Sequence, residues 1–208
     1  MKIFKFFPFL DCQTVKTGNL VNRVLLFTLE VSVHNNLSIE IKARIDNLDS
    51  IRTFLKRHHA DYRGEDHQVD TYFAVRQGKL KIREGTIENS LVHYERQEIK
   101  GPKRCEYSIV QFIPGDPVLQ QLKKMLVSAV GILVVVDKKR EIYFLDTIKF
   151  HLDRVDELGT FFEIEVGKSE LCDEAGQYEQ CRELLKQLDI SEEHLVTGSY
   201  SDMMLAKL

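Results

Sequence analysis

The stretch Ser38-Ile-Glu-Ile-Lys-Ala-Arg-Ile45 alternates without a break between polar and apolar residues. A β-strand places successive side chains on opposite faces, so the isoleucines share one face with Ala43 and the charged residues share the other. The charged face carries Glu40, Lys42 and Arg44 at steps of roughly 7 Å. The solvent-exposed face of an ordinary half-buried strand has a mixture of polar residues with fewer charges. The stretch therefore predicts a strand with one apolar face and one densely charged face.

Charged residues on one strand face recur along the chain, as like-charged pairs separated by one residue. The pairs are Lys81 and Arg83, Lys138 and Arg140, and Glu163 and Glu165. Like charges on one strand face repel unless something of opposite sign lies between them. Basic pairs favour a polyanion and an acidic pair favours a divalent cation, so polyphosphate with Mg²⁺ or Mn²⁺ would satisfy both. For each pair taken alone, a solvated outer face is the simpler interpretation.

The composition is that of an ordinary globular protein, with 208 residues, 43 % of them apolar and 29 % charged. The formal net charge is −3, whereas a nucleic-acid-binding protein is normally basic over a whole face, so nucleic acid is not an expected partner. The four cysteines show no Cys-x-x-Cys spacing. They are predicted to be reduced thiols of a cytoplasmic protein rather than a zinc site.

Residues 1–35 are predicted to be an N-terminal extension outside the core fold, and residues 36–208 to form one domain. The Phe-rich start has no long apolar core and no small-residue cleavage site, so a secretory signal is not predicted. A mitochondrial presequence fits poorly, because basic residues are few. The apolar run at residues 20–33 is shorter than the roughly 20 residues that span a bilayer, so no membrane association is expected.

The remaining chain reads as an alternation of strands and a few helices. Amphipathic patterns predict helices at residues 47–59, 118–130 and 179–188, with another short element in the tail at 195–208. Besides 38–45, strand-like runs lie at residues 68–76, 79–84, 91–100, 104–112, 133–145, 148–155 and 161–166, and residues 60–67 are predicted to be a polar connection. This order predicts an α+β domain whose antiparallel sheet closes into a barrel. Inward charges of both signs in a barrel would need a ligand or a metal.

Several segments of the chain, taken in their order along the sequence, resemble the CYTH superfamily, the triphosphate tunnel metalloenzymes. This superfamily includes class IV adenylate cyclase, thiamine triphosphatase and inorganic tripolyphosphatases. Ser38-Ile-Glu-Ile-Lys42 falls on the first-strand Glu-x-Glu-x-Lys signature of that family. The other matching segments are Val69–Phe73, Leu80–Glu84, Tyr94–Arg96, Gly101–Arg104, Val136–Tyr143, His151–Val155, Leu158–Gly159, Phe162–Glu165 and Gly198–Asp202. The resemblance runs from Leu37 to about Leu205 and implies a closed antiparallel eight-stranded β-barrel with flanking helices.

The resemblance also implies roles for individual residues. By position, eight basic residues would bind phosphate: Lys42, Lys81, Arg83, Arg96, Lys103, Arg104, Lys138 and Arg140. Four acidic residues would hold Mg²⁺ or Mn²⁺: Glu40, Asp153, Glu163 and Glu165. Asp146 is a further candidate ligand, and His151, which shares a strand face with Asp153, is more often structural than catalytic in such a position. The base that would activate a hydroxyl or a water is not identified.

The implied function is metal-dependent chemistry on a small triphosphate: ATP, tripolyphosphate or thiamine triphosphate. The branch resembled most is class IV adenylate cyclase, which converts ATP to cyclic AMP and pyrophosphate. The alternatives are a triphosphatase, or a polyphosphate- or nucleotide-binding module with little turnover. Ser38 stands where the family signature has its first Glu, and a hydroxyl binds a hard cation less well than a carboxylate, which favours the binding module. A second copy of the chain is a candidate partner, in a homodimer.

Overall fold

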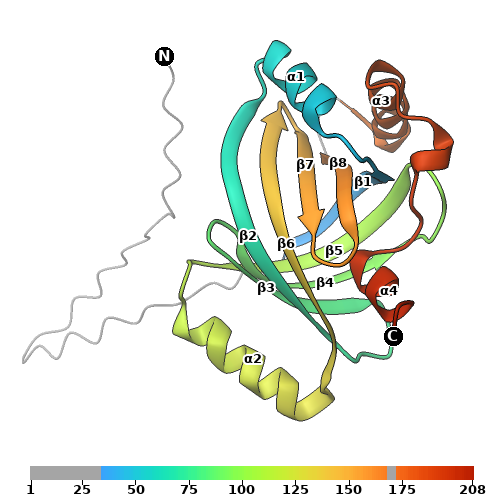
Figure 1. The fold of residues 1–208 in the computed structure, drawn as a ribbon. Helices are drawn as coiled ribbons and strands as arrows, with labels where there is room; N and C mark the ends of the chain where they lie inside the picture. The colour runs from blue at the N-terminus through green and yellow to red at the C-terminus, as the bar shows by residue number, and fades with distance from the viewer. Residues whose placement is uncertain (1–33, 168–171) are drawn as a thin grey trace, which may run out of the picture. The chain divides into compact units, whose positions relative to one another are not determined.

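The computed structural model describes residues 34–167 and 172–208. In this part of the chain, eight antiparallel strands close into a barrel in the order β1-β5-β4-β3-β2-β6-β7-β8 (Figure 1). The strands are β1 (His34–Arg44), β2 (Asp61–Phe73), β3 (Lys79–Gly85), β4 (Asn89–Arg96), β5 (Lys103–Phe112), β6 (Ile132–Leu145), β7 (Ile148–Val155) and β8 (Gly159–Gly167). The helices are α1 (Asp49–Arg57), α2 (Pro117–Val130), α3 (Glu174–Gln187) and α4 (Tyr200–Leu205), with a 3₁₀ turn at Glu192–His194. The predicted fold class is confirmed.

The apolar face of β1 points out of the barrel, and α1 and α3 cover it. Ile39, Ile41 and Ala43 are buried in one cluster with Ile51 of α1 and Cys181 of α3. Each aliphatic side chain buried in this way contributes about 1.5–3 kcal/mol. Because successive side chains alternate, burial of this face outside the barrel turns the charged face of β1 toward the interior.

A second outer cluster lies under α2, where Leu119 packs against Phe73 of β2 and Ile82 of β3. The helix begins at Pro117, and the Asp116 side chain caps it by accepting a hydrogen bond from the backbone N–H of Val118 at 2.8 Å. Burial of Ile82 on the outside directs its neighbours in β3, including Lys81 and Arg83, to the inside.

The C-terminal segment, residues 195–205, covers one end of the barrel interior. The Val196 N–H donates to the carbonyl of Lys42 in β1 at 2.9 Å. Ser199 then starts α4 with a capping box formed with Asp202. The hydroxyl of Tyr200 donates to Asp153 of β7 at 2.6 Å, and this ring packs edge-on against Phe161 of β8. The predicted short element in the tail is therefore the lid of the barrel at this end.

Residues 61–67 are strand and not the polar connection expected from the sequence. They form the first half of β2 and pair with β6 from Asp61, opposite Phe144. The alternation that reveals an ordinary strand is missing here because both faces are polar, with Glu65 and His67 exposed on the outside. Asp66 and Gln68 are fully buried and hydrogen-bonded to each other at 2.7 Å.

The first strand of the described residues, β1, begins at His34. Residues 1–33, which make up nearly all of the predicted extension, lie outside the described residues. Within the described ranges, no helix combines the length and the apolar character that crossing a bilayer requires.

Candidate functional site

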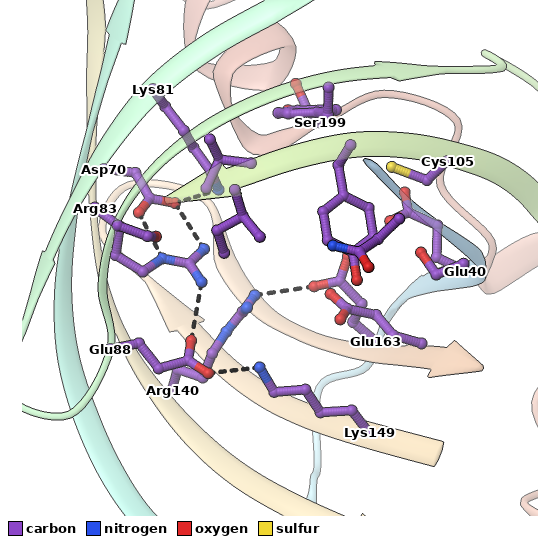
Figure 2. Close-up of a pocket in the computed structure, with 18 of the residues that line it drawn as sticks. Glu40, Asp70, Lys81, Arg83, Glu88, Cys105, Arg140, Lys149, Glu163 and Ser199 are labelled. Carbon is purple, nitrogen blue, oxygen red and sulfur yellow. Dashed lines mark hydrogen bonds and ion pairs between the residues drawn. The ribbon is translucent and has the colours of Figure 1, made fainter. Parts of the chain in front are cut away.

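The barrel encloses a cavity of about 790 Å³ to which all eight strands contribute side chains. Lys42, Lys81, Arg83 and Arg140 all line it, as their spacing along the strands predicts. Figure 2 shows their counterions in the same space, including Asp70, Glu88 and Glu163. The charged strand faces of the sequence are therefore the inner wall of the barrel rather than solvated outer faces.

Asp70 of β2 is the centre of a buried cluster of three cations. Its carboxylate accepts hydrogen bonds from Lys81 at 2.9 Å, Arg83 at 2.9 Å and Lys138 at 2.7 Å. Burial alone would raise the pKa of Asp70, but Arg83, Lys138 and Lys81 hold that pKa well below its ordinary value. Burial lowers the pKa of Lys138 to about 7, against the attraction of Asp70. Asp70 thus fixes three of the predicted phosphate-binding side chains in position.

Glu88, in the β3–β4 turn, joins two cationic walls of the cavity. It accepts from Arg83 of β3 at 3.0 Å and from Lys149 of β7 at 2.5 Å (Figure 2). Buried Asp66 holds this turn by accepting from the backbone N–H groups of Ile87 and Glu88 at 2.8 and 2.9 Å. Glu88 therefore bridges the cavity because a buried carboxylate fixes the backbone beneath it.

Glu163 of β8 is a second anionic centre. It contacts Lys42 of β1 at 2.8 Å and Arg140 of β6 at 2.9 Å. Burial alone would raise the pKa of Glu163, but Lys42, with His151 and Arg140, holds it well below its ordinary value. Asp153 lies behind Arg140 and accepts two hydrogen bonds from its guanidinium, at 2.7 and 2.5 Å. The structure thus places Asp153 as a buried support of Arg140 rather than on the cavity wall.

Three carboxylates gather where β1 meets β8. Glu40 lies directly opposite Glu165 in the strand register, and Glu163 is two residues before Glu165. Burial raises the pKa of Glu40, and Glu163 and Glu165 raise it further, although Arg96 at 2.6 Å opposes this. Mutual repulsion of this kind is what a bound cation relieves.

A metal ion would fit this corner of the cavity. His151 of β7 stands opposite Glu163, and ligand atoms of His151, Glu163 and Glu165 lie within 4.8 Å of one another. Glu165 forms no ion pair with a lysine or arginine among the described residues, whereas the other carboxylates of the cavity do. Burial lowers the pKa of His151, and Arg140 adds to this effect. The donor set fits a divalent cation, with His151 as a candidate ligand in place of Asp153.

Besides Asp153, three predicted basic residues and one acidic residue do not reach the cavity. Lys103 is buried at the lid, where it donates to the carbonyls of residues 196 and 197 at 2.8 and 2.9 Å, and burial lowers its pKa to about 8. Arg104, its neighbour in β5, points outward and pairs with glutamates on the outer surface. Lys138 lies behind Asp70. Asp146 is exposed in the β6–β7 turn, at a positive φ of 53°.

The other predicted residues line the cavity, and so do several that the sequence analysis did not single out. Arg96 and Glu40 meet across it, and Ser38, at 4 % exposure, lies on its wall opposite Cys105 in the register. The residues that were missed are Asp70, Glu88 and Lys149. Lys149 was detectable, since it precedes His151 and Asp153 by steps of two in β7.

Comparison with known proteins gives one family. Residues 36–200 match the CYTH domain. A protein of Methanocaldococcus jannaschii named "putative adenylate cyclase" is 27 % identical over 176 residues, which cover 80 % of this chain and 98 % of that protein. A solved structure from Pyrococcus horikoshii is 26 % identical, with a TM-score of 0.63, and covers 79 % of this chain and 98 % of its own.

The fold is shared more widely than the sequence. A Hippeastrum protein, named as a "putative adenylyl cyclase" with a dominant triphosphatase activity, is 14 % identical, with a TM-score of 0.53. The match covers 83 % of this chain and 95 % of that one. With the family matched over most of its length and with the barrel and its charged cavity as described, this chain belongs to the CYTH domain family.

Proposed function

We propose that this protein is a metal-dependent enzyme that acts on a nucleoside triphosphate held in the barrel, in the manner of class IV adenylate cyclase. The observation that carries the proposal is the convergence of six lysines and arginines on one cavity inside a barrel of the CYTH family. They are Lys42, Lys81, Arg83, Arg96, Arg140 and Lys149. A triphosphate is the small molecule whose charge and length match such a set of cations.

The chemistry requires alignment and charge neutralisation more than covalent catalysis. Lys42 and Arg140 both contact Glu163 in the carboxylate corner, so they would bind the phosphate that a metal also contacts. Arg83 and Lys81, fixed by Asp70, would bind phosphate oxygens from the opposite wall. Rigidly placed cations of this kind stabilise the charge that moves onto the leaving phosphate.

The metal, Mg²⁺ or Mn²⁺, would be held by Glu163 and Glu165, with Glu40 close by. When bound, it supplies a Lewis acid that polarises a phosphoryl oxygen. The chain's own contribution is to keep these carboxylates ionised and facing one point. Lys42 and Arg140 do this for Glu163, by favouring its charged form.

The wall formed by β4, β5 and the turn before them supports an organic substrate over inorganic tripolyphosphate. Its cavity-facing side chains are mostly uncharged: Ile87, Asn89, Ser90, Val92, Ile109, Gln111 and Phe112. Apolar surface with a few amides is the environment that binds a heteroaromatic base. This wall lies away from the lid. Gln111, near one end of β5, pairs with Ser90 of β4, whereas Lys103, at the other end of β5, contacts the lid.

Cyclisation and hydrolysis differ in the nucleophile and in the phosphorus that it attacks. In cyclisation the 3′-oxygen of ATP attacks the α-phosphorus, its proton leaves to a base, and pyrophosphate departs. In hydrolysis a water attacks the terminal phosphorus and loses a proton, so that orthophosphate forms and pyrophosphate or thiamine diphosphate is the leaving group. The second candidate function, a triphosphatase, belongs in any assay because a protein of the same fold from Hippeastrum carries that activity in its name. A nucleotide-binding module with little turnover is the third, favoured by Ser38 at the cavity wall.

The deciding experiment supplies ATP, tripolyphosphate and thiamine triphosphate in parallel, each with Mg²⁺ or Mn²⁺, and measures cyclic AMP, pyrophosphate and orthophosphate. We expect ATP to give cyclic AMP and pyrophosphate in equal amounts. Lys42→Met should abolish the reaction, and Lys139→Met, a matched control on the exposed face of β6, should leave it unchanged. Orthophosphate without cyclic AMP would assign the triphosphatase instead. Binding without any product would assign the binding module.

A further inference from the structure

We propose that His151 is a nitrogen ligand of the cation bound by Glu163 and Glu165, and that this ligand makes the site select Mn²⁺ over Mg²⁺. The inference deepens the proposed function and rests on its metal. It differs from the arrangement that the sequence suggested, in which all of the ligands were carboxylates and Asp153 was one of them.

Strand register places the three donors together. His151 of β7 pairs directly with Glu163 of β8, and Glu165 is the next residue of β8 on the same face. His151 Nδ1 lies 3.3 Å from Glu163 Oε2 and 3.6 Å from Glu165 Oε1. One imidazole nitrogen thus faces two carboxylates at once, on adjacent strands of a rigid barrel.

Asp153, by contrast, is not available to a cation in the cavity. Both of its oxygens accept from Arg140, and one also accepts from the hydroxyl of Tyr200. His151 is equally buried, but its Nδ1 faces Glu163 and Glu165, whereas the oxygens of Asp153 are occupied by these donors. His151, two residues earlier in β7, is therefore the residue of this strand that can complete the donor set.

A hydrogen bond alone leaves this group of three unsatisfied. An Nδ1–H can be directed at only one of the two carboxylates, and Glu165 forms no ion pair with a lysine or arginine in the described ranges. The second ring nitrogen, Nε2, is buried and has no hydrogen-bond partner among those residues. Of the cations nearby, Lys42 and Arg140 pair with Glu163, and Arg96 pairs with Glu40. Lys149 lies opposite Glu165 in the strand register, but its ammonium group pairs with Glu88. A cation between Nδ1, Glu163 and Glu165 would contact all three donors.

The donor set decides which cation. Mg²⁺ takes oxygen ligands and requires nearly ideal octahedral geometry. First-row transition ions bind a given nitrogen and oxygen donor set more tightly than Mg²⁺ does, and Mn²⁺ is the one of them that shares the preference of Mg²⁺ for carboxylate oxygen. One nitrogen with two carboxylate oxygens therefore favours Mn²⁺.

The test measures metal binding to the full chain in the absence of any nucleotide, by calorimetric titration with MnCl₂ and with MgCl₂. The informative variant is His151→Asn, because the asparagine amide oxygen occupies nearly the position of Nδ1 and changes only the donor type. His93→Asn is the matched control, since His93 is exposed and contacts the carbonyl of Gln77 on the outer surface. We expect the wild type and His93→Asn to prefer Mn²⁺ and His151→Asn to lose Mn²⁺ affinity by at least about tenfold, the lower bound for residues that support a metal site. Equal preference in His151→Asn and the wild type would overturn the proposal.

A second measurement does not depend on the folding of a variant. Pulsed electron paramagnetic resonance of the Mn²⁺-loaded wild type should show hyperfine coupling to one imidazole nitrogen. Mn²⁺ bound without nitrogen coupling, or no Mn²⁺ binding at all, would overturn the proposal. A nitrogen-coupled Mn²⁺ in a protein that turns over no triphosphate would refute the proposed function and leave this inference standing.

Discussion

Replacing Asp70 with asparagine removes one negative charge from among three buried cations. Asp70 is 1 % exposed and Lys138 is equally buried, so water screens little of their interaction. Asparagine keeps the size of the side chain and one hydrogen-bond acceptor, so the change isolates the charge. Lys81 has no other carboxylate within reach among the described residues, whereas Arg83 retains Glu88. Lys81, Arg83 and Lys138 are then left in low dielectric without their shared counterion.

The magnitude follows from these contacts. Breaking a buried ion pair by removing one partner costs about 3–5 kcal/mol. Lys138 relieves part of this, since its pKa of about 7 allows it to lose its proton at neutral pH, and Asp70 is what keeps that pKa from falling further. Arg83 is partly compensated by Glu88. We therefore expect Asp70→Asn to lower the free energy of unfolding by about 3 kcal/mol at pH 7.

The assay is urea unfolding followed by circular dichroism, from pH 7 to pH 3. The pKa of Asp70 is depressed in the folded state, so its contribution is fully present above the ordinary value of 3.8 and is lost as the pH falls below it. The difference between the wild type and Asp70→Asn should therefore shrink below about pH 4. Asp137→Asn, on the outer face of β6, is the control and should cost under about 0.5 kcal/mol. A loss below about 1 kcal/mol for Asp70→Asn at pH 7 would refute the view that this carboxylate organises the cations.

Five further changes, three substitutions and two truncations, test the site and its limits. Ser38→Glu adds a carboxylate to the cavity wall, so the metal concentration for half-maximal rate should fall about 5- to 30-fold, equivalent to about 1–2 kcal/mol; no change would place this position outside the metal's reach. Glu165→Gln should abolish metal-dependent turnover without altering Tm. Glu163→Gln should lower both, because it leaves buried Lys42 without its carboxylate, while Arg140 keeps Asp153; equal Tm values would contradict this. A chain starting at His34 should keep fold and turnover, and one starting at Ser38 should lose stability with its pairing to β5; an unfolded His34 chain would make the extension part of the core.

The fold was predictable because the outer face of the barrel follows the usual rule. Ile39 and Ile41 alternate with charged residues, and their burial under helices is what the hydrophobic period indicates. The same rule failed at residues 61–67, where Asp66 and Gln68 face inward. The outer face is polar there too, with Glu65 and His67 exposed, so no hydrophobic period remains and the first half of β2 read as a loop.

The sequence pattern predicted which face of each strand the site residues occupy, but not which of them reach the cavity wall. Spacing of two assigned Lys81 and Arg83 to one face, yet it could not separate a side chain on the cavity wall from one behind it. Asp153 and Lys138 share the inward parity of their neighbours but contact other protein groups instead of the cavity. Arg104 was misplaced for a simpler reason, since it differs by one position from the inward-facing residues of β5.

The resting cavity is almost neutral, and this constrains how a substrate enters it. Six lysines and arginines face five carboxylates, which leaves about one unit of positive charge. Each of these cations already forms an ion pair with one of the carboxylates or with Asp153. A triphosphate must therefore displace carboxylates from the lysines and arginines, because no unpaired cation is waiting for it among the described residues of the cavity. Lys42 and Arg140 can turn to phosphate only when something else compensates Glu163, and a divalent cation between Glu163 and Glu165 does that. Metal and triphosphate should accordingly strengthen each other's binding by the same factor, because each releases the groups that the other needs.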